Sequence, residues 1–184
     1  AWIPDSSVVS GLGFHTSGYY SHPTVFNDGG TWKLIYGDYN DNFYGYYWTG
    51  STWTEDSNIV TGLSVTDYAK PTVYNDSGTL KLISGHWTGT FSGFYWSGSA
   101  WVSDSSVVAG LGDVGSNSAA DVYYDSGTLK LIAGEGDGNF NGYYWSGSAW
   151  VSDSSVIDGL TGVYDYSTPA VYNDAGTWKI VSGN

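Results

Sequence analysis

Residues Phe94–Val108 read FYWSGSAWVSDSSVV, and nearly the same stretch, YYWSGSAWVSDSSVI, returns at Tyr143–Ile157, about 49 positions later. A more divergent copy, YYWTGSTWTEDSNIV, occupies Tyr46–Val60. A fixed period of this length is the sequence signature of a repeat architecture, in which each unit buries its apolar face against its neighbours. This recurrence is therefore the strongest evidence for the class of fold.

A second motif recurs with the same spacing and completes the unit. Its four copies are FNDGGTWKLIYG from Phe26, YNDSGTLKLISG from Tyr74, YYDSGTLKLIAG from Tyr123 and YNDAGTWKIVSG from Tyr172. Aromatic and β-branched runs separated by tight Gly-containing turns are typical of β-hairpins, and no segment carries apolar residues at helical spacing. The sequence thus predicts an all-β, four-bladed β-propeller of roughly 48-residue, four-stranded repeats. A β-sandwich would give no reason for near-identical units.

The two ends of the chain leave the last repeat incomplete. Ala1–Val9 matches a fourth strand and Thr177–Ser182 a second strand, whereas the last unit lacks its third strand. We expect the N-terminal strand to close the last blade by pairing with Thr177–Ser182, which gives three strands there and a monomer. Oligomerisation through this incomplete blade is the alternative. The expected organisation is one propeller domain over 1–184, with units at approximately 20–60, 69–108, 118–157 and 167–184 plus 1–9.

The unit resembles the blades of the FG-GAP/VCBS-type β-propellers, in which an Asp-rich turn leads into an apolar strand that ends in glycine. Propeller lectins are a second resemblance, through their repeated Trp- and Tyr-rich blades. The first family usually carries a calcium loop with several aspartates between its first two strands. The corresponding loops here hold one carboxylate each, as in Asn75-Asp76-Ser77-Gly78, whereas calcium prefers about six to eight oxygen ligands. No metal or other cofactor is therefore expected in these turns.

Composition restricts the partners of the protein. The formal net charge is −13, and the five basic residues are all lysines, which argues against nucleic acid and anionic membrane surfaces as ligands. The absence of cysteine excludes disulfides and thiolate metal sites. No stretch reaches the roughly 18–20 apolar residues needed to span a bilayer, so membrane insertion is not expected. The acidic, aromatic- and Gly-rich composition favours a secreted or cell-surface protein.

Two sets of repeated side chains are assigned structural roles. Three tryptophans should face three others across the Gly-Ser turns, and we expect these pairs to pack between blades instead of forming a sugar-stacking platform. The pairs are Trp48–Trp53, Trp96–Trp101 and Trp145–Trp150. Four lysines share one mid-strand position, and we expect each to bond an Asp or a turn carbonyl of a neighbouring blade, because an unpaired buried charge is costly. They are Lys33, Lys81, Lys130 and Lys179.

The copies differ most in two loops, the one after the second strand and the crossover from the fourth strand to the next first strand. Because the strands alternate in direction, both sets should emerge at one end of the propeller, here called the loop face. Functional residues usually sit on such loops. The candidate ligand-binding residues are Tyr39, Asp41, Asp67, Tyr68, His86, Trp87, Glu135, Asp137, Tyr164 and Asp165. A single calcium site at Glu135, Asp137 and Asn139 is an alternative use of the third loop.

The sequence offers little for catalysis. It contains no Cys nucleophile, no Gly-x-Ser-x-Gly elbow, no His-Glu-x-x-His motif and no Gly-x-x-x-x-Gly-Lys phosphate loop. Trp and Tyr rings suit the apolar faces of sugars, and Asp and Asn suit their hydroxyl groups. We therefore expect a non-catalytic carbohydrate-binding or adhesive module, whose partner is a glycan or another cell-surface ligand. A structural or engineered scaffold without a ligand is the alternative. A glycoside-cleaving enzyme, which needs two facing carboxylates, is the third.

Overall fold

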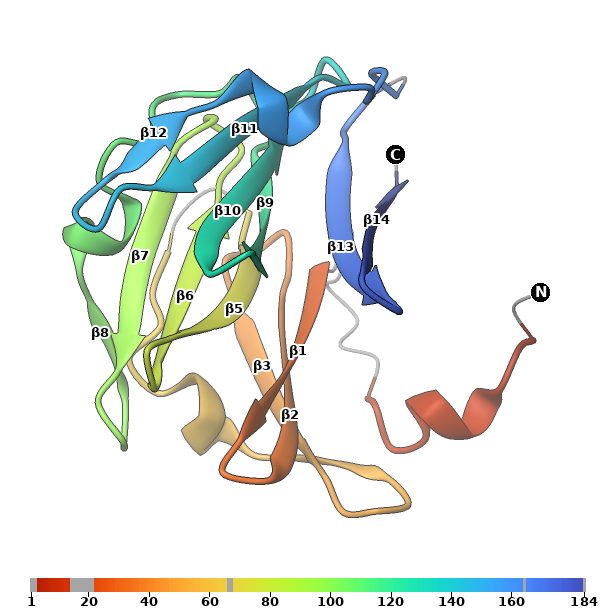
Figure 1. The fold of residues 1–184 in the computed structure, drawn as a ribbon. Coiled ribbons are helices and arrows are strands. Elements are labelled where there is room, and N and C mark those ends of the chain that lie inside the picture. Colours follow the sequence, from red (N-terminus) through yellow and green to blue (C-terminus); the bar gives the residue numbers. More distant parts are fainter. Residues whose placement is uncertain (1–2, 14–21, 66–67, 164, 184) are drawn as a thin grey trace.

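The computed structural model describes residues 3–13, 22–65, 68–163 and 165–183. Three four-stranded antiparallel sheets and a two-stranded sheet follow one another along this part of the chain (Figure 1). Each sheet is one blade, with its strands in sequence order, so the chain is an all-β propeller with a short last blade, as predicted. The strands are β1 His22–Asp28, β2 Thr31–Gly37, β3 Phe43–Trp48 and β4 Trp53–Glu55 in blade 1; β5 Lys70–Asp76, β6 Thr79–Gly85, β7 Phe91–Trp96 and β8 Trp101–Ser103 in blade 2; β9 Ala119–Asp125, β10 Thr128–Gly134, β11 Phe140–Trp145 and β12 Trp150–Ser152 in blade 3; and β13 Thr168–Asp174 and β14 Thr177–Gly183 in blade 4.

The first strands of the four blades lie around the centre of the molecule. Strand β1 packs on β5, β5 on β9, and β9 on β13. Each core cluster contains apolar side chains from consecutive blades. Phe26 and Ile35 of blade 1, for example, lie in one cluster with Leu82 and Trp101 of blade 2. The core therefore lies in the seams between blades, which is why a single repeat could not bury its apolar face alone.

The predicted fourth strands are only three residues long. Each is followed by a short 3₁₀ helix: η2 at Ser57–Val60, η3 at Ser105–Val108 and η4 at Ser154–Ile157. An aspartate caps the N-terminus of each of these 3₁₀ helices. In η3, the Asp104 carboxylate accepts a 2.8 Å hydrogen bond from the backbone N–H of Ser106. No helix in the described ranges is long and apolar enough to cross a membrane.

The tryptophan pairs lie as predicted, with each Trp opposite its partner across the hairpin. The ring centroids are 5.3 Å apart in all three pairs. The second tryptophan of each pair, on the fourth strand, also bonds across the seam: the indole N–H of Trp101 donates a 2.9 Å hydrogen bond to the carbonyl of Ile59 in the preceding blade. This bond confirms that the pairs serve inter-blade packing.

The repeated lysines pair differently from the prediction. The Lys81 ammonium lies 2.7 Å from the Asp76 carboxylate, and Lys33 lies 2.6 Å from Asp28, so each partner belongs to the same hairpin and not to a neighbouring blade. The reason is geometric. Lysine and aspartate stand five residues apart on either side of a tight turn, within reach of each other without leaving the blade. The seam contributes instead an aromatic contact, with the Lys81 ammonium 5.7 Å from the centre of a Trp145 ring.

The N-terminal segment also departs from the prediction. Ser6–Val9 forms a 3₁₀ helix, η1, and in the described residues β14 pairs only with β13, so blade 4 has two strands there and not three. A 3₁₀ segment cannot supply the extended backbone that a ladder needs. η1 lies against blade 1 (Figure 1), where the carbonyls of Ser10 and Val8 accept hydrogen bonds of 2.8 and 2.9 Å from the backbone and indole N–H groups of Trp53.

Candidate functional site

A repeated set of backbone hydrogen bonds orders the two sets of loops that form the loop face. Each loop after a second strand is closed in the same way, as by the 3.2 Å bond from His86 N–H to the Thr90 carbonyl. The following crossover is tied to that loop: Ser118 N–H donates to the His86 carbonyl at 3.0 Å, and Asn117 N–H to the Trp87 carbonyl at 2.9 Å. The two loop sets therefore lie together at one end of the propeller, as expected.

Four aromatic side chains, here called the aromatic row, run across this face. Tyr39 and Tyr68 have ring centroids 4.3 Å apart, Tyr68 and Trp87 lie 5.2 Å apart, and Trp87 and Tyr166 lie 6.5 Å apart with an interplanar angle of 29°. Tyr39, Trp87 and Tyr166 are each more than two fifths exposed. Rings from separate loops thus form one continuous, solvent-facing apolar strip, which is uncommon on a polar loop surface.

The backbone under this row is strained. Tyr68 has φ 65° and Tyr166 has φ 58°, in the left-handed region that costs a non-glycine residue about 1–2 kcal/mol. Asp41, itself at φ 65°, accepts a 2.9 Å hydrogen bond from Tyr68 N–H and so fixes this conformation. Glycine would adopt these angles at lower cost, so the tyrosines occupy positions at which they reduce stability.

The remaining candidates are placed in several ways. His86 is buried, and its Nε2 lies 2.9 Å from Ser92 Oγ, so its side chain supports the loop from within and does not face solvent. Asp137 and Asp165 are exposed, whereas Glu135 is half-buried, with its carboxylate against Gly115. Asp67 and Tyr164 lie outside the described residues. Tyr166 was not among the candidates, although it occupies the same repeat position as Tyr68.

The alternative calcium site gains no support from the geometry. In the described ranges no three His, Cys, Asp or Glu residues come together as a metal site. Of the proposed ligands, Asp137 and Asn139 are exposed while the Glu135 carboxylate is directed at Gly115. The third loop is closed by its own backbone, with Glu135 N–H donating to the Asn139 carbonyl at 3.2 Å.

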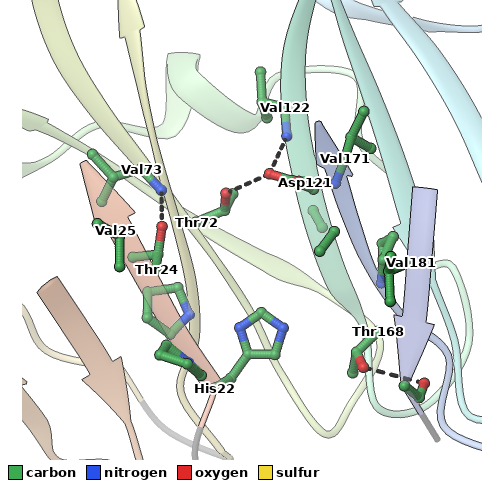
Figure 2. Close-up of a pocket in the computed structure, with 16 residues that line it drawn as sticks. His22, Thr24, Val25, Thr72, Val73, Asp121, Val122, Thr168, Val171 and Val181 are labelled. Carbon is green, nitrogen blue, oxygen red and sulfur yellow. Dashed lines mark hydrogen bonds between the residues drawn. The ribbon is translucent and has the colours of Figure 1, made fainter. Parts of the chain in front are cut away.

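A cavity of about 620 Å³ occupies the centre, lined by the first strands of all four blades and by β14 (Figure 2). Side chains from one blade accept hydrogen bonds from backbone N–H groups of the next: Val73 N–H donates to Thr24 Oγ1 at 3.2 Å, and Val171 N–H to the Asp121 carboxylate at 2.6 Å. Thr72 Oγ1 donates to the same carboxylate at 3.2 Å. Burial raises the pKa of Asp121 despite these bonds.

Two basic side chains start the inner strands of blades 1 and 2. Lys70 is buried, and its ammonium donates to the backbone carbonyl of Asn117 at 2.9 Å. Desolvation lowers the pKa of Lys70 to about 8, and desolvation together with the Lys70 charge lowers that of His22 to about 4. At neutral pH His22 is therefore uncharged and Lys70 is mostly charged. Lys70 breaks the repeat pattern, since the other blades carry His22, Ala119 and Thr168 at its position.

Comparison with known proteins places the fold in one class. No protein-family model and no curated protein matches the chain. A mutant of the Aleuria aurantia lectin in complex with Fucα1-6GlcNAc is similar to it, with a TM-score of 0.58 and 16% identity over 91% of this chain and 58% of that chain. The fucose-specific lectin of Aleuria aurantia in a mercury derivative gives a TM-score of 0.58 and 17% identity, over 88% and 56% of the two chains.

An enzyme shares the same architecture. An α-L-arabinofuranosidase from Clostridium thermocellum has a TM-score of 0.58 and 12% identity, over 91% of this chain and 62% of that chain. At such identities the likeness shows the β-propeller fold and leaves function to be argued from the site. The chain spans less than two thirds of the length of each of these three proteins.

Proposed function

We propose that this propeller is a non-catalytic module that binds a carbohydrate on its loop face. The observation that carries the proposal is the aromatic row, four rings in contact order from separate loops, with three of them well exposed. The C–H faces of a sugar ring are apolar, and they pack on Trp and Tyr planes in the same way as other apolar groups. A purely structural scaffold would have no use for exposed rings held on strained backbone.

The arrangement of the row suits an extended ligand more than a single deep pocket. Trp87 and Tyr166 present nearly parallel planes 6.5 Å apart, and Tyr68 stands edge-on beside Trp87. Exposed carboxylates lie next to the row in sequence, Asp165 beside Tyr166, and could accept hydrogen bonds from sugar hydroxyls. Polar groups around an apolar platform give orientation to a ligand that the rings alone would hold loosely.

Fucosylated glycans are the first class to test, because the similar lectins were solved with fucose-containing ligands or are described as fucose-specific. A glycan array probed with the labelled protein should show binding to a restricted set of saccharides. An array without any signal would favour the ligand-free scaffold. Release of free sugar from an array hit, followed by mass spectrometry, would instead favour the glycoside-cleaving alternative. A role in glycan recognition fits a secreted or cell-surface location.

A further inference from the structure

Blade 4 exposes a face that the other blades bury. Val181 on β14 occupies the repeat position of Ile35, Ile83 and Ile132, which are 0%, 0% and 4% exposed, yet Val181 is 54% exposed. Tyr172, which corresponds to the buried Phe26 of blade 1, is also exposed. In the first three blades this face packs on the following blade, so blade 4 carries the same apolar face without a following blade in the described residues.

Blade 1 exposes the complementary face. Trp32 is 51% exposed, whereas Leu80 and Leu129 at the same repeat position are 9% and 5% exposed because the preceding blade covers them. The seam between blades 3 and 4 shows how the two faces meet, since Tyr123 packs on Trp178 with ring centroids 4.8 Å apart. Tyr172 and Trp32 are the same two repeat positions, and both are exposed.

The outer half of the missing contact is already in place. η1 bonds to Trp53 as η2 bonds to Trp101 in the next seam, so η1 holds the outer position of a blade that precedes blade 1. Among the residues that the structure describes, none takes the inner position next to β1 that a β13–β14 hairpin would fill. Within the described ranges β1 makes no packing with β13 comparable to that of the other neighbouring first strands.

We infer that these two faces bind each other between copies of this chain, head to tail, with blade 4 of one copy packed against blade 1 of the next. A second copy accounts for these faces better than closure within one chain, because in the single chain Val181, Tyr172 and Trp32 stay exposed and, in the described ranges, β1 does not pack on β13 as the other neighbouring first strands pack on each other. Residues of β1 and of β14 instead line a cavity of about 620 Å³ (Figure 2).

The mass in solution tests this inference. Light scattering after size exclusion, at physiological salt to screen the −13 charge of each copy, should give at least twice the chain mass of 19.7 kDa. Val181→Asp places a charge in the seam and should give the monomer mass with an unchanged far-ultraviolet circular dichroism spectrum. Val151→Asp is the matched control, since Val151 is exposed on an outer strand away from the seam, and it should assemble like the wild type. A wild-type monomer, or an assembly that survives Val181→Asp, would overturn the inference.

Cross-linking distinguishes a second copy from closure within one chain. The chain has no cysteine, so Trp32→Cys and Tyr172→Cys variants each carry one thiol. A short bismaleimide should join the two variants when they are mixed, giving a covalent dimer, and neither variant alone should cross-link to the same extent. If the mixture stays monomeric while a chain with both substitutions forms an internal cross-link, the faces meet within one chain and the inference is wrong.

Discussion

The indole N–H of Trp150 donates a 2.9 Å hydrogen bond to the carbonyl oxygen of Val107 and so fastens blade 3 to blade 2. The backbone N–H of the same tryptophan donates to Ala109 at 2.8 Å. The same pair of bonds joins Trp101 to blade 1 and Trp53 to η1. Each seam therefore combines apolar packing with hydrogen bonds of fixed orientation. These contacts hold the blades, and with them the loops of the candidate site, in place.

Removing an indole N–H that bonds across a seam should lower the free energy of unfolding more than replacing the neighbouring tryptophan of the same hairpin. Trp150→Phe keeps an aromatic ring but leaves the buried Val107 carbonyl without its partner, and we expect a loss of about 2–4 kcal/mol in the free energy of unfolding by urea. Trp145→Phe is the control from the same hairpin and should cost less. Equal losses would show that the hydrogen bond contributes nothing beyond ring packing.

Gly62 lies in a seam where no larger residue fits. Its φ is +87°, and a Cβ there would clash with the carbonyl oxygen of Trp101 in the next blade. Gly62→Ala should therefore cost more than about 3 kcal/mol, from backbone strain and displacement of the seam. Gly98→Ala, at φ +98° but with open space around it, should cost only the strain of about 1–2 kcal/mol. Similar melting temperatures for the two variants would contradict the seam geometry.

Acid should lower the free energy of unfolding partly by protonating the aspartates of the Lys–Asp pairs. The hydrogen bond from Lys81 lowers the pKa of Asp76 below its usual value near 3.9, so the folded chain binds fewer protons than the unfolded one. This stabilisation is complete above pH about 4 and is lost as the pH falls through the folded pKa. Lys81→Met keeps the apolar stem, and its urea midpoint should fall less steeply below pH about 4 than that of the wild type. Parallel curves would mean that the pair adds no stability, and a loss of glycan binding in this variant would refute its structural role.

Replacing Tyr166 should affect glycan affinity without lowering the stability of the fold. At φ 58° a glycine is less strained than tyrosine, so Tyr166→Gly should leave the melting temperature unchanged or slightly higher, by up to about 1 kcal/mol of stability. The same variant should bind glycan several-fold more weakly, because one ring of the aromatic row is lost. A large drop in melting temperature with unchanged binding would assign Tyr166 to the fold and not to the site.

Much of the fold was readable from the sequence because the repeat imposes it. The period, the hairpin turns and the facing tryptophans all follow from residues that recur at fixed offsets. The partner of Lys81 was misplaced although its signal was present, since an aspartate stands five residues before each repeated lysine. The Asp104 cap was likewise readable as a turn signal, and it ends the fourth strand of blade 2 at Ser103.

The site was less predictable, because loop residues of the same type have different surroundings. His86 and Trp87 are adjacent in sequence, yet the histidine turns inward to Ser92 and the tryptophan outward to Tyr68. Which side a loop residue takes depends on backbone bonds to the next crossover, and those join positions about 30 residues apart, as in the Ser118–His86 pair. Lys70 was overlooked because its position in the repeat holds no other lysine.

The most direct test of carbohydrate binding through the aromatic row is a calorimetric titration of the strongest array ligand into three proteins. We expect saturable binding by the wild type, at least about tenfold weaker binding by Trp87→Ala, and wild-type affinity for Tyr124→Ala. Tyr124 is as exposed as Trp87, at 43% for both, but stands next to a tight hairpin turn away from the row. Equal affinities of Trp87→Ala and the wild type, or the absence of any saccharide that binds the wild type, would refute carbohydrate binding through the aromatic row.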